Sequence, residues 1–382
     1  MKILFLAPLP FVDESGSSIH ARNVIQTLKE AGHELDVVCF PFGRDPEIPG
    51  VRVIRVGRWW PRKRSSVPAR RRLWFDFLIA CKALGLCLAH RYQAVHALQE
   101  SVFIGAFLKR LFRMRLVYDM KFPISDKVHS RSSWLLRPWF RLFERWEASA
   151  ISSSNLVTTL CPSLSEWVRD HAPAARFVQI EDAPLYPSYR ADDEAACKLR
   201  ADLKLEAGPV VFCGDLFGPC EGAELLVKAA RSILKARPDV QFLVMCCDNA
   251  RLRRLRKLAH SLDLEGRFRF MISPAPSALP ALLTLASALV SPRTQGMITP
   301  AEMITFMQSG KPIVATRLPL HTQSLDDACA LLAMPQPDDI AAAALRALEE
   351  PLFSNAMGRA AQCRVAANYS LASFKHKVRS AY

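Results

Sequence analysis

Residues 287–316 read SALVSPRTQGMITPAEMITFMQSGKPIVAT, and the order of elements in this stretch decides the fold. A short apolar run, a polar loop, an amphipathic segment and a second apolar run follow one another. Gly310 predicts the end of the helical segment, because glycine readily adopts the left-handed conformation that closes helices. The pattern indicates a strand, a helix and a parallel strand, which is the repeating unit of an α/β sheet.

The loop between the first strand and the helix has the features of an anion-binding site. We expect Thr299 to cap the helix, Pro300 to take its first position and Glu302 to complete a capping box. The free N–H groups of a helix start favour an anion, and Arg293 adds a bidentate cationic donor just upstream. The loop is therefore predicted to cradle a diphosphate. The alternative is that Arg293 only pairs with a carboxylate of the same domain.

The same alternation of apolar runs and amphipathic segments extends along the chain. Strands are predicted at KILFLA (2–7), ELDVVCF (34–40), VRVIRV (51–56), AVHAL (94–98), RLVYDM (115–120), NLVTTL (155–160), PVVFCGD (209–215), QFLVMCC (241–247), RFRFM (267–271), SALVS (287–291) and PIVAT (312–316). The alternation breaks in the polar run 182–208, where we place a domain boundary. We therefore expect two doubly wound α/β domains with ligands at the carboxyl ends of their strands.

The composition narrows the class of protein. The chain has 382 residues, half of them hydrophobic, which suits two folded domains and excludes global disorder. Lys and Arg number 51 against 36 Asp and Glu, and the formal charge of +15 favours nucleotide phosphates, nucleic acid or an acidic membrane face as partners. The eleven cysteines show no metal-ligand spacing and are expected to be buried thiols in a reducing compartment.

Two segments bear on the membrane. The first eleven residues fit a buried strand better than a signal peptide, and no apolar run is long enough to span a bilayer. The stretch 51–75, VRVIRVGRWWPRKRSSVPARRRLWF, interleaves arginines with tryptophans and contains no acid. It predicts a patch for a membrane or an acidic partner, although a solvated surface loop is the alternative. The patch residues are Trp59, Trp60, Arg62, Arg64, Arg70, Arg71 and Arg72.

Individual polar residues mark strand ends in the first domain. Asp119 lies near the end of RLVYDM, where the carboxyl ends of parallel strands line a ligand site. His96 lies in AVHAL and is interpreted equally well as a site residue or as a satisfied structural histidine. Glu100 opens the following helix, where an acid is favourable for helix-dipole reasons alone.

The segment SPRTQGMITPAEMITFMQSGKPIVATRLPLHTQSL resembles the donor-binding segment of family-4 glycosyltransferases, which are retaining enzymes of the GT-B fold. One bacterial branch has the pattern S-P-R-x-x-G-x-N-T-P, then a helix, S-G-K-P-I-V-A-T and H-T-Q. The matching positions are Ser291, Pro292, Arg293, Gly296, Thr299, Pro300, Ser309 to Thr316, His321, Thr322 and Gln323. SGSSIHARNVIQTLKEAGHEL, VVFCGDLFGPCEGAELLVKAA and NYSLASFKHKVRSAY are also similar to family segments, so the resemblance covers nearly the whole chain.

This resemblance implies an acceptor-side Rossmann-like domain at residues 1–185, a nucleotide-sugar donor domain at 186–365, a cleft between them, and a helix at 366–382 that packs back on the first domain. It implies retaining transfer of a sugar, without metal or cofactor, from a nucleotide diphosphate to a glycan or lipid-linked acceptor in bacterial envelope polysaccharide synthesis. The chain would be cytoplasmic, or peripheral on the inner face of the cytoplasmic membrane, with an anionic membrane surface as a further partner and no nucleic acid.

The resemblance also assigns site residues. The implied donor-binding residues are Gly16, Ser17, Gly214, Arg293, Gly296, Thr299, Pro300 and Thr305. The implied catalytic residues, at the carboxyl ends of the strands of the first domain, are Asp119, His96 and Lys121.

The chain departs from the family at several of these positions. The two cations that grip the diphosphate in many members correspond to Asp215 and Glu221, and Lys121 replaces a histidine. The two family glutamates fall on Thr305 and on or near Gln295 or Met297. The departures keep open a catalytically degenerate GT-B-like binding or scaffold protein. A nucleic-acid-binding protein is suggested by charge alone, and a nucleotide-sugar epimerase lacks motif support.

Overall fold

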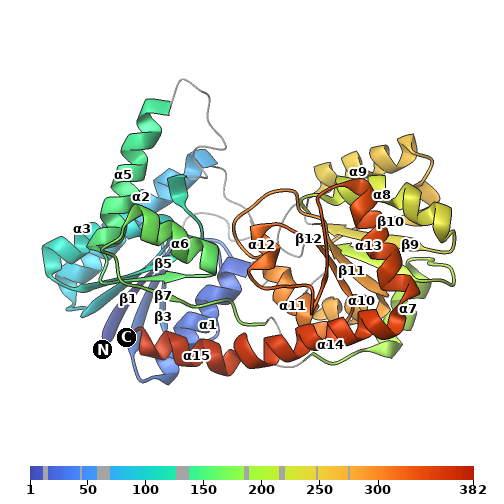
Figure 1. The fold of residues 1–382 in the computed structure, drawn as a ribbon. Coiled ribbons are helices and arrows are strands. Elements are labelled where there is room, and N and C mark those ends of the chain that lie inside the picture. The colour runs from blue at the N-terminus through green and yellow to red at the C-terminus, as the bar shows by residue number, and fades with distance from the viewer. Residues whose placement is uncertain are drawn as a thin grey trace. The chain divides into compact units, whose positions relative to one another are not determined.

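The computed structural model describes residues 1–11, 16–43, 45–57, 69–125, 137–184, 189–214, 220–246, 248–273 and 276–382. The chain divides into two compact units (Figure 1). Unit 1 comprises Met1–Glu181 and Ala372–Tyr382, and unit 2 comprises Asp182–Leu371. The chain therefore returns to unit 1 at its end, as a crossover helix requires.

Unit 1 is built on a sheet of seven parallel strands in the order β3-β2-β1-β4-β5-β6-β7. The strands are β1 (Lys2–Ala7), β2 (Glu34–Cys39), β3 (Arg52–Arg55), β4 (Ala94–Leu98), β5 (Arg115–Met120), β6 (Leu156–Thr159) and β7 (Phe177–Gln179). The central strands β1 and β4 are buried almost throughout, as is usual for parallel sheets covered on both faces. The order of connection reverses between β1 and β4, which makes their carboxyl ends the expected ligand-binding position.

Helices cover both faces of this sheet. They are α1 (Gly16–Glu30), α2 (Ala69–Ala89), α3 (Val102–Phe112), α5 (Arg137–Ser153), α6 (Pro162–His171) and α15 (Leu371–Ser380), with a short 3₁₀ helix η1 (Gln99–Ser101). Right-handed crossovers place α1 on one face and α2, α3 and α5 on the other, because β1 to β2 and β3 to β4 run in opposite directions across the sheet. Lys375 of α15 pairs with Glu30 of α1 at 2.8 Å.

Unit 2 contains a sheet of six parallel strands in the order β10-β9-β8-β11-β12-β13. The strands are β8 (Val210–Gly214), β9 (Gln241–Cys246), β10 (Phe268–Ile272), β11 (Ala288–Ser291), β12 (Ile313–Thr316) and β13 (Leu331–Ala333). The helices are α7 (Asp193–Asp202), α8 (Ala223–Ala236), α9 (Asn249–Ser261), α10 (Leu279–Leu285), α11 (Ala301–Ser309), α12 (Pro319–Thr322), α13 (Pro337–Glu349) and α14 (Pro351–Asn368), with 3₁₀ helices η3 (Glu265–Arg267) and η4 (Pro276–Ala278). Separate apolar cores lie on the two faces.

The doubly wound fold expected from the alternation is confirmed, and every predicted strand is present within two residues of its predicted ends. Two edge strands were missed. β7 and β13 are three residues long each, which is too short for a periodic pattern to show. The prediction of buried cysteines is wrong for Cys81, Cys197 and Cys363, which are exposed, because they lie on the outer faces of helices.

Candidate functional site

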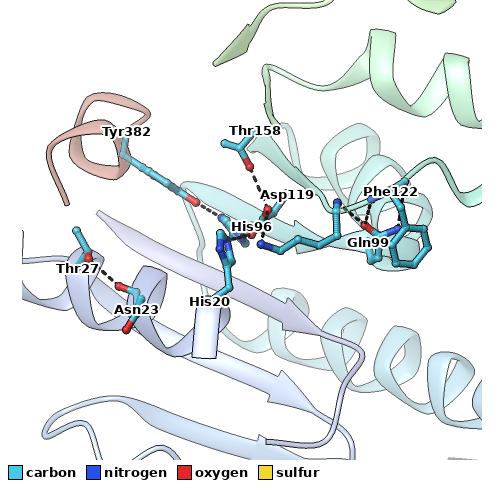
Figure 2. A network of polar contacts seen from close by, with 10 residues as sticks. His20, Asn23, Thr27, His96, Gln99, Asp119, Phe122, Thr158 and Tyr382 are labelled. Carbon is cyan, nitrogen blue, oxygen red and sulfur yellow. Dashed lines mark hydrogen bonds and ion pairs between the residues drawn. The ribbon is translucent and has the colours of Figure 1, made fainter. Parts of the chain in front are cut away.

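Polar side chains from three strands and one helix of unit 1 meet around Asp119 of β5 (Figure 2). Oδ2 of Asp119 lies 3.0 Å from Nε2 of His20 in α1 and 3.3 Å from Nε2 of His96 in β4. Thr158 of β6, which pairs with Asp119 in the sheet, donates from Oγ1 to Oδ1 of Asp119 at 3.2 Å. The Nδ1 atom of His96 in turn contacts the hydroxyl of Tyr382. The structure therefore brings together His96 and Asp119, two of the predicted catalytic residues.

The charges in this cluster follow from burial and neighbours. Burial would raise the pKa of Asp119, but the ammonium of Lys121 and the two histidines hold that pKa well below its ordinary value. Burial lowers the pKa of His96, and Asp119 opposes this only partly. Neutral His96 can thus donate from Nε2 to the ionised Asp119 and accept at Nδ1 from the hydroxyl of Tyr382. Burial raises the pKa of Tyr382, so this hydroxyl keeps its proton.

The cluster is enclosed. Asp119 and His96 are only 1% and 2% exposed, and the His96 ring stacks on Phe5 with centroids 4.2 Å apart. Apolar side chains, including Val24 and Val378, line a small cavity beside the two histidines. Asp119 and His96 therefore hold elements together and present almost no open surface of their own.

His20 belongs to this cluster and was missed by sequence reasoning. It lies in the second turn of α1, and its ring makes an edge contact with Phe374 of α15 at a centroid distance of 5.7 Å. The available signal was a histidine within the segment SGSSIHARNVIQTLKEAGHEL, which resembles the family. A single histidine on an amphipathic helix does not reveal its partner, because that partner is distant in sequence.

Lys121 follows β5 and lies in a loop that two buried side chains fix. Its Nζ is 3.8 Å from Oδ1 of Asp119. Gln99, which has the left-handed φ of 53°, accepts from the backbone N–H of Lys121 at 2.5 Å and donates to the carbonyl of Phe122 at 2.9 Å. The carboxylate of Glu147 in α5 accepts from the backbone N–H groups of Ile124 and Ser125. The position of Lys121 is therefore set by the loop backbone.

Two predicted donor-binding residues begin helix α1. Gly16 is its first residue. Ser17 is exposed, whereas Ser18 is buried and donates to the carbonyl of Pro10 at 2.8 Å. The exposed first turn keeps the geometry that favours an anion.

In unit 2, Arg293 lies directly after β11 and pairs with two carboxylates. Its Nη2 is 3.0 Å from Oε1 of Glu302, and its Nη1 is 3.4 Å from Oε2 of Glu221. Pairing with carboxylates of the same domain, the alternative raised from the sequence, is thus present. The phosphate role of Arg293 stays a prediction.

The predicted capping box is wrong. Helix α11 begins at Ala301, so Pro300 and not Thr299 is the N-cap, and no side chain among the described residues caps the helix. Glu302 is buried and turns toward Arg293, with which it forms a charge-assisted pair. The N-terminal turn is thereby left without a side-chain acceptor, which suits an anionic ligand.

The H-T-Q residues hold the loop before α11 in place. His321 of α12 contacts Oγ of Ser291 through Nε2 at 2.9 Å and the carbonyl of Thr316 through Nδ1 at 2.9 Å. Burial, with a smaller contribution from Arg293, lowers the pKa of His321 to about 4, and the hydrogen bond to the carbonyl of Thr316 opposes this decrease. Gln323 donates to the carbonyl of Met297 at 3.0 Å. These contacts connect the ends of β11 and β12 to the loop.

A pocket of about 430 Å³ opens beside Glu221. Its lining is Glu221, Gly222, Glu224, Leu225, Lys228, Arg251, Thr294, Gln295, Pro335 and Pro337. Arg251 of α9 donates to Glu224 at 2.9 Å, and Lys228 is exposed on α8. Sequence reasoning missed both cations. Lys228 lies in the quoted segment VVFCGDLFGPCEGAELLVKAA but was not singled out there, and Arg251 lies outside the segments that resemble the family.

The remaining predicted donor-binding residues, and Gly222 near them, lie in different local environments. Gly214 ends β8 and is buried, and Gly296 has a φ of 129° that favours glycine. Gly222 approaches the end of β11 so closely that a Cβ there would lie 1.9 Å from the carbonyl oxygen of Pro292. Thr305 is fully buried, and its hydroxyl has no hydrogen-bond partner among the described residues.

The predicted basic patch is only partly described. Trp59, Trp60, Arg62 and Arg64, together with the side chain of Arg70, lie outside the described residues. Arg71 is exposed at the start of α2. Arg72 pairs with Glu100, so Glu100 serves at least as an ion-pair partner. In the part of the chain that the structure describes, no cluster of His, Cys, Asp and Glu is suited to a metal, and no helix is long and apolar enough to cross a membrane.

Comparisons with known proteins agree with this architecture. Residues 15–181 match the family model Glycosyltransferase Family 4, and residues 208–350 match Glycosyl transferases group 1. No match was found among curated proteins. Among solved structures, sucrose-phosphate synthase from Thermosynechococcus elongatus is similar over 100% of this chain and 98% of its own, with a TM-score of 0.76 and 17% identity.

Two further solved structures are similar over both units. HepE from Anabaena, in complex with UDP and glucose, has a TM-score of 0.77 and 17% identity, with 100% of this chain and 98% of its own covered. WaaG, a glycosyltransferase involved in lipopolysaccharide biosynthesis, has a TM-score of 0.73 and 15% identity, with 99% of each chain covered. At these identities the similarity establishes the fold.

Proposed function

Because the chain is a family-4, group 1 glycosyltransferase of the GT-B fold, we propose that it transfers a sugar from a nucleotide diphosphate to a glycan or lipid-linked acceptor. The proposal includes retention of the anomeric configuration, independence of metal, and a role in bacterial envelope polysaccharide synthesis. It places the chain in the cytoplasm or on the inner face of the cytoplasmic membrane, with an anionic membrane surface as a further partner.

One observation carries the donor assignment. Arg293 stands at the end of β11, before an uncapped helix start and beside the pocket that contains Lys228 and Arg251. An arginine, a free helix N-terminus and neighbouring cations are the groups that stabilise a diphosphate. The similar HepE structure holds UDP and glucose, which supports a nucleotide-sugar donor for this chain.

The chemistry needs geometry more than it needs acid–base groups. The acceptor hydroxyl oxygen forms a bond to the anomeric carbon on the face from which the diphosphate departs. The bonding electrons of the broken carbon–oxygen bond go to the diphosphate, and the acceptor proton passes to a departing phosphate oxygen. Arg293 and the α11 N-terminus would stabilise the charge that develops on the leaving group.

In this proposal Asp119 and His96 act as positioning residues, since both are enclosed. Their contacts would hold the ends of β4 and β5, and with them Lys121 and the start of α1, in position for the ligand. Lys121 would add positive charge near the phosphate or sugar. Thr305, with a buried hydroxyl lacking a described partner, would accept or donate one hydrogen bond where the family has an acid.

The test is thermal stabilisation by a panel of UDP-, GDP-, ADP- and CMP-linked sugars, followed by transfer assays with and without EDTA. We expect one donor to raise the melting temperature of the wild type and not of Arg293→Ala. The anomeric configuration of the product, measured by NMR, checks retention. Equal stabilisation of both proteins would refute the role of Arg293.

The second candidate is a catalytically degenerate GT-B-like binding or scaffold protein. Glu221 favours this candidate. Its carboxylate pairs with Arg293, and it stands at a position where many family members carry a cation that binds the diphosphate. A chain that no nucleotide-sugar stabilises would support this candidate, and detectable donor hydrolysis or transfer would exclude it.

A further inference from the structure

Helix α2 is apolar on two faces. Phe75, Ile79 and Ala83 are buried, and Phe75 lies within 5.5 Å of the ring centroids of Phe40 and Phe42 in the core of unit 1. The core therefore accounts for only one face of the helix. An amphipathic helix at the surface of a globular protein ordinarily carries its large apolar side chains on the face that the core covers.

The other face of α2 carries large apolar side chains into solvent. Leu73, Trp74, Phe77 and Leu88 are 76%, 55%, 56% and 72% exposed, and the rings of Trp74 and Phe77 stack on each other. Leu73 and Phe77 are four residues apart, so they lie on one side of the helix.

Helices α3 and α5 continue this exposed apolar surface. Phe107 and Leu111 of α3, and Leu142 and Trp146 of α5, are exposed and again spaced four residues apart. Phe103 and Phe143 join the two helices with ring centroids 5.8 Å apart. The crossover rule places α2, α3 and α5 on the same face of the sheet (Figure 1). In the described part of the chain, these helices carry eight of the thirteen exposed large apolar side chains.

The charge on these helices identifies the partner. Their sequences contain nine Lys and Arg against three Asp and Glu. Of the acids, Asp76 and Glu147 are largely buried, which leaves Glu144 exposed beside the exposed cations Lys82, Arg110 and Arg145. Apolar and aromatic side chains interspersed with exposed cations match the boundary between headgroups and acyl chains of an anionic bilayer.

We propose that the exposed face of α2, α3 and α5, here called the helical face, docks unit 1 onto an anionic lipid bilayer. Trp74, Phe77, Phe107 and Trp146 enter the headgroup–acyl boundary, while Lys82, Arg110 and Arg145 contact lipid phosphates. A second copy of the chain fits this face less well, because two equally basic faces repel each other.

This inference deepens the proposed function, since a lipid-linked acceptor resides in a bilayer, but it is tested without donor or acceptor. A chain that docks on vesicles yet binds no nucleotide-sugar would contradict only the proposed function. A chain that transfers sugar to a soluble acceptor yet ignores vesicles would contradict only this inference.

The experiment is flotation of the full chain with vesicles of phosphatidylcholine alone and of phosphatidylcholine with phosphatidylglycerol. We expect binding to the mixed vesicles that weakens as salt increases. The apolar variant Trp74→Ser, Phe77→Ser, Phe107→Ser, Trp146→Ser should lower the partition coefficient by about a hundredfold or more. The charge variant Lys82→Glu, Arg110→Glu, Arg145→Glu should lower it by about a hundredfold.

A matched control is Met334→Ser with Leu352→Ser, which removes exposed apolar side chains of unit 2 and should leave binding unchanged. Circular dichroism and the melting temperature confirm folding of each variant, and the charge variant keeps the test decisive where the apolar variant does not fold. Wild-type flotation that is absent, or that both variants leave intact, overturns the proposal. Sedimentation of a wild-type dimer that the apolar variant abolishes, without vesicle binding, would assign the face to a second copy.

Discussion

The Nε2 atom of His20 lies 3.0 Å from Oδ2 of Asp119, although 99 residues separate them in the sequence. This contact joins α1, which begins with the predicted donor residues Gly16 and Ser17, to the strand that ends before Lys121. One buried carboxylate therefore fixes the start of α1 relative to Lys121.

Replacing Asp119 with asparagine should destabilise unit 1 by about 3 kcal/mol. The change removes the negative charge beside buried Lys121, and it weakens the acceptor to which His20 and His96 both donate. The denaturant midpoint measures this loss. Thr158→Val, which removes one neutral hydrogen bond to the same carboxylate, is the matched control and should cost about 1 kcal/mol. Equal losses in the two variants would contradict an ionised Asp119.

His20→Gln and His20→Leu separate positioning from packing. The glutamine amide can donate to Asp119 from nearly the place of Nε2, so the rate of transfer should stay within about tenfold of the wild type. Leucine fills the space without a donor and should lower kcat more than it raises KM, since it misplaces the α1 start. Similar kinetics for the two variants would show that His20 only packs.

The carboxylates around Arg293 should tune donor affinity. Glu221 is partly exposed and competes with a diphosphate for the guanidinium, so Glu221→Gln should tighten nucleotide-sugar binding by up to about fivefold. Glu302 is buried, and Glu302→Gln should loosen Arg293 and weaken binding. Calorimetric titration with the donor found in the stability panel checks both. Weaker binding by Glu221→Gln would mean that Glu221 itself contacts the ligand.

The buried His321 should make the stability of unit 2 sensitive to acid. Its pKa is lowered from 6.5 to about 4, chiefly by burial, so the folded state binds fewer protons than the unfolded state between these values. Its contribution is fully present above pH 6.5 and is lost as the pH falls toward 4. This loss amounts to about 3 kcal/mol. The denaturant midpoint of His321→Asn should be lower at neutral pH and should depend less on pH over this window. An unchanged pH dependence would show that His321 does not titrate there.

The sequence predicts the scaffold better than the contacts, and particular residues show why. KILFLA and RLVYDM become β1 and β5 without change of ends, because a buried parallel strand is a local apolar run. Gly310 ends α11 in the left-handed conformation, as predicted, because helix closure is also local. Asp119 was placed correctly at a strand end, since topology alone fixes that edge.

The parts that failed depend on contacts distant in sequence. Thr299 is a residue type that often caps helices, but α11 begins later, at Ala301. Glu302, which was expected to complete the capping box, pairs with Arg293 instead. The partner of His20 is another element entirely, and no periodic pattern records it. The outward apolar face of α2 was not found for the same reason, because apolar residues lie on both faces of this helix and their pattern does not reveal which face the core covers.

Asp76 of α2 supplies a last prediction. Burial raises its pKa from 3.8 to about 7, with Glu100 adding to the rise and Arg72 opposing it, and its Oδ1 has no hydrogen-bond partner in the described structure. The folded state therefore holds a proton that the unfolded state releases. This contribution to stability is complete below pH 3.8 and is lost as the pH rises through about 7.

Asp76→Asn keeps the shape of the side chain and removes its titration, so it should stabilise the chain at pH 8 by up to about 4 kcal/mol and change its stability little at pH 4. Glu144→Gln, at an exposed carboxyl on α5, is the control and should shift the denaturant midpoint at neither pH. If Asp76→Asn is no more stable than the wild type at pH 8, the carboxylate is solvated or paired in solution.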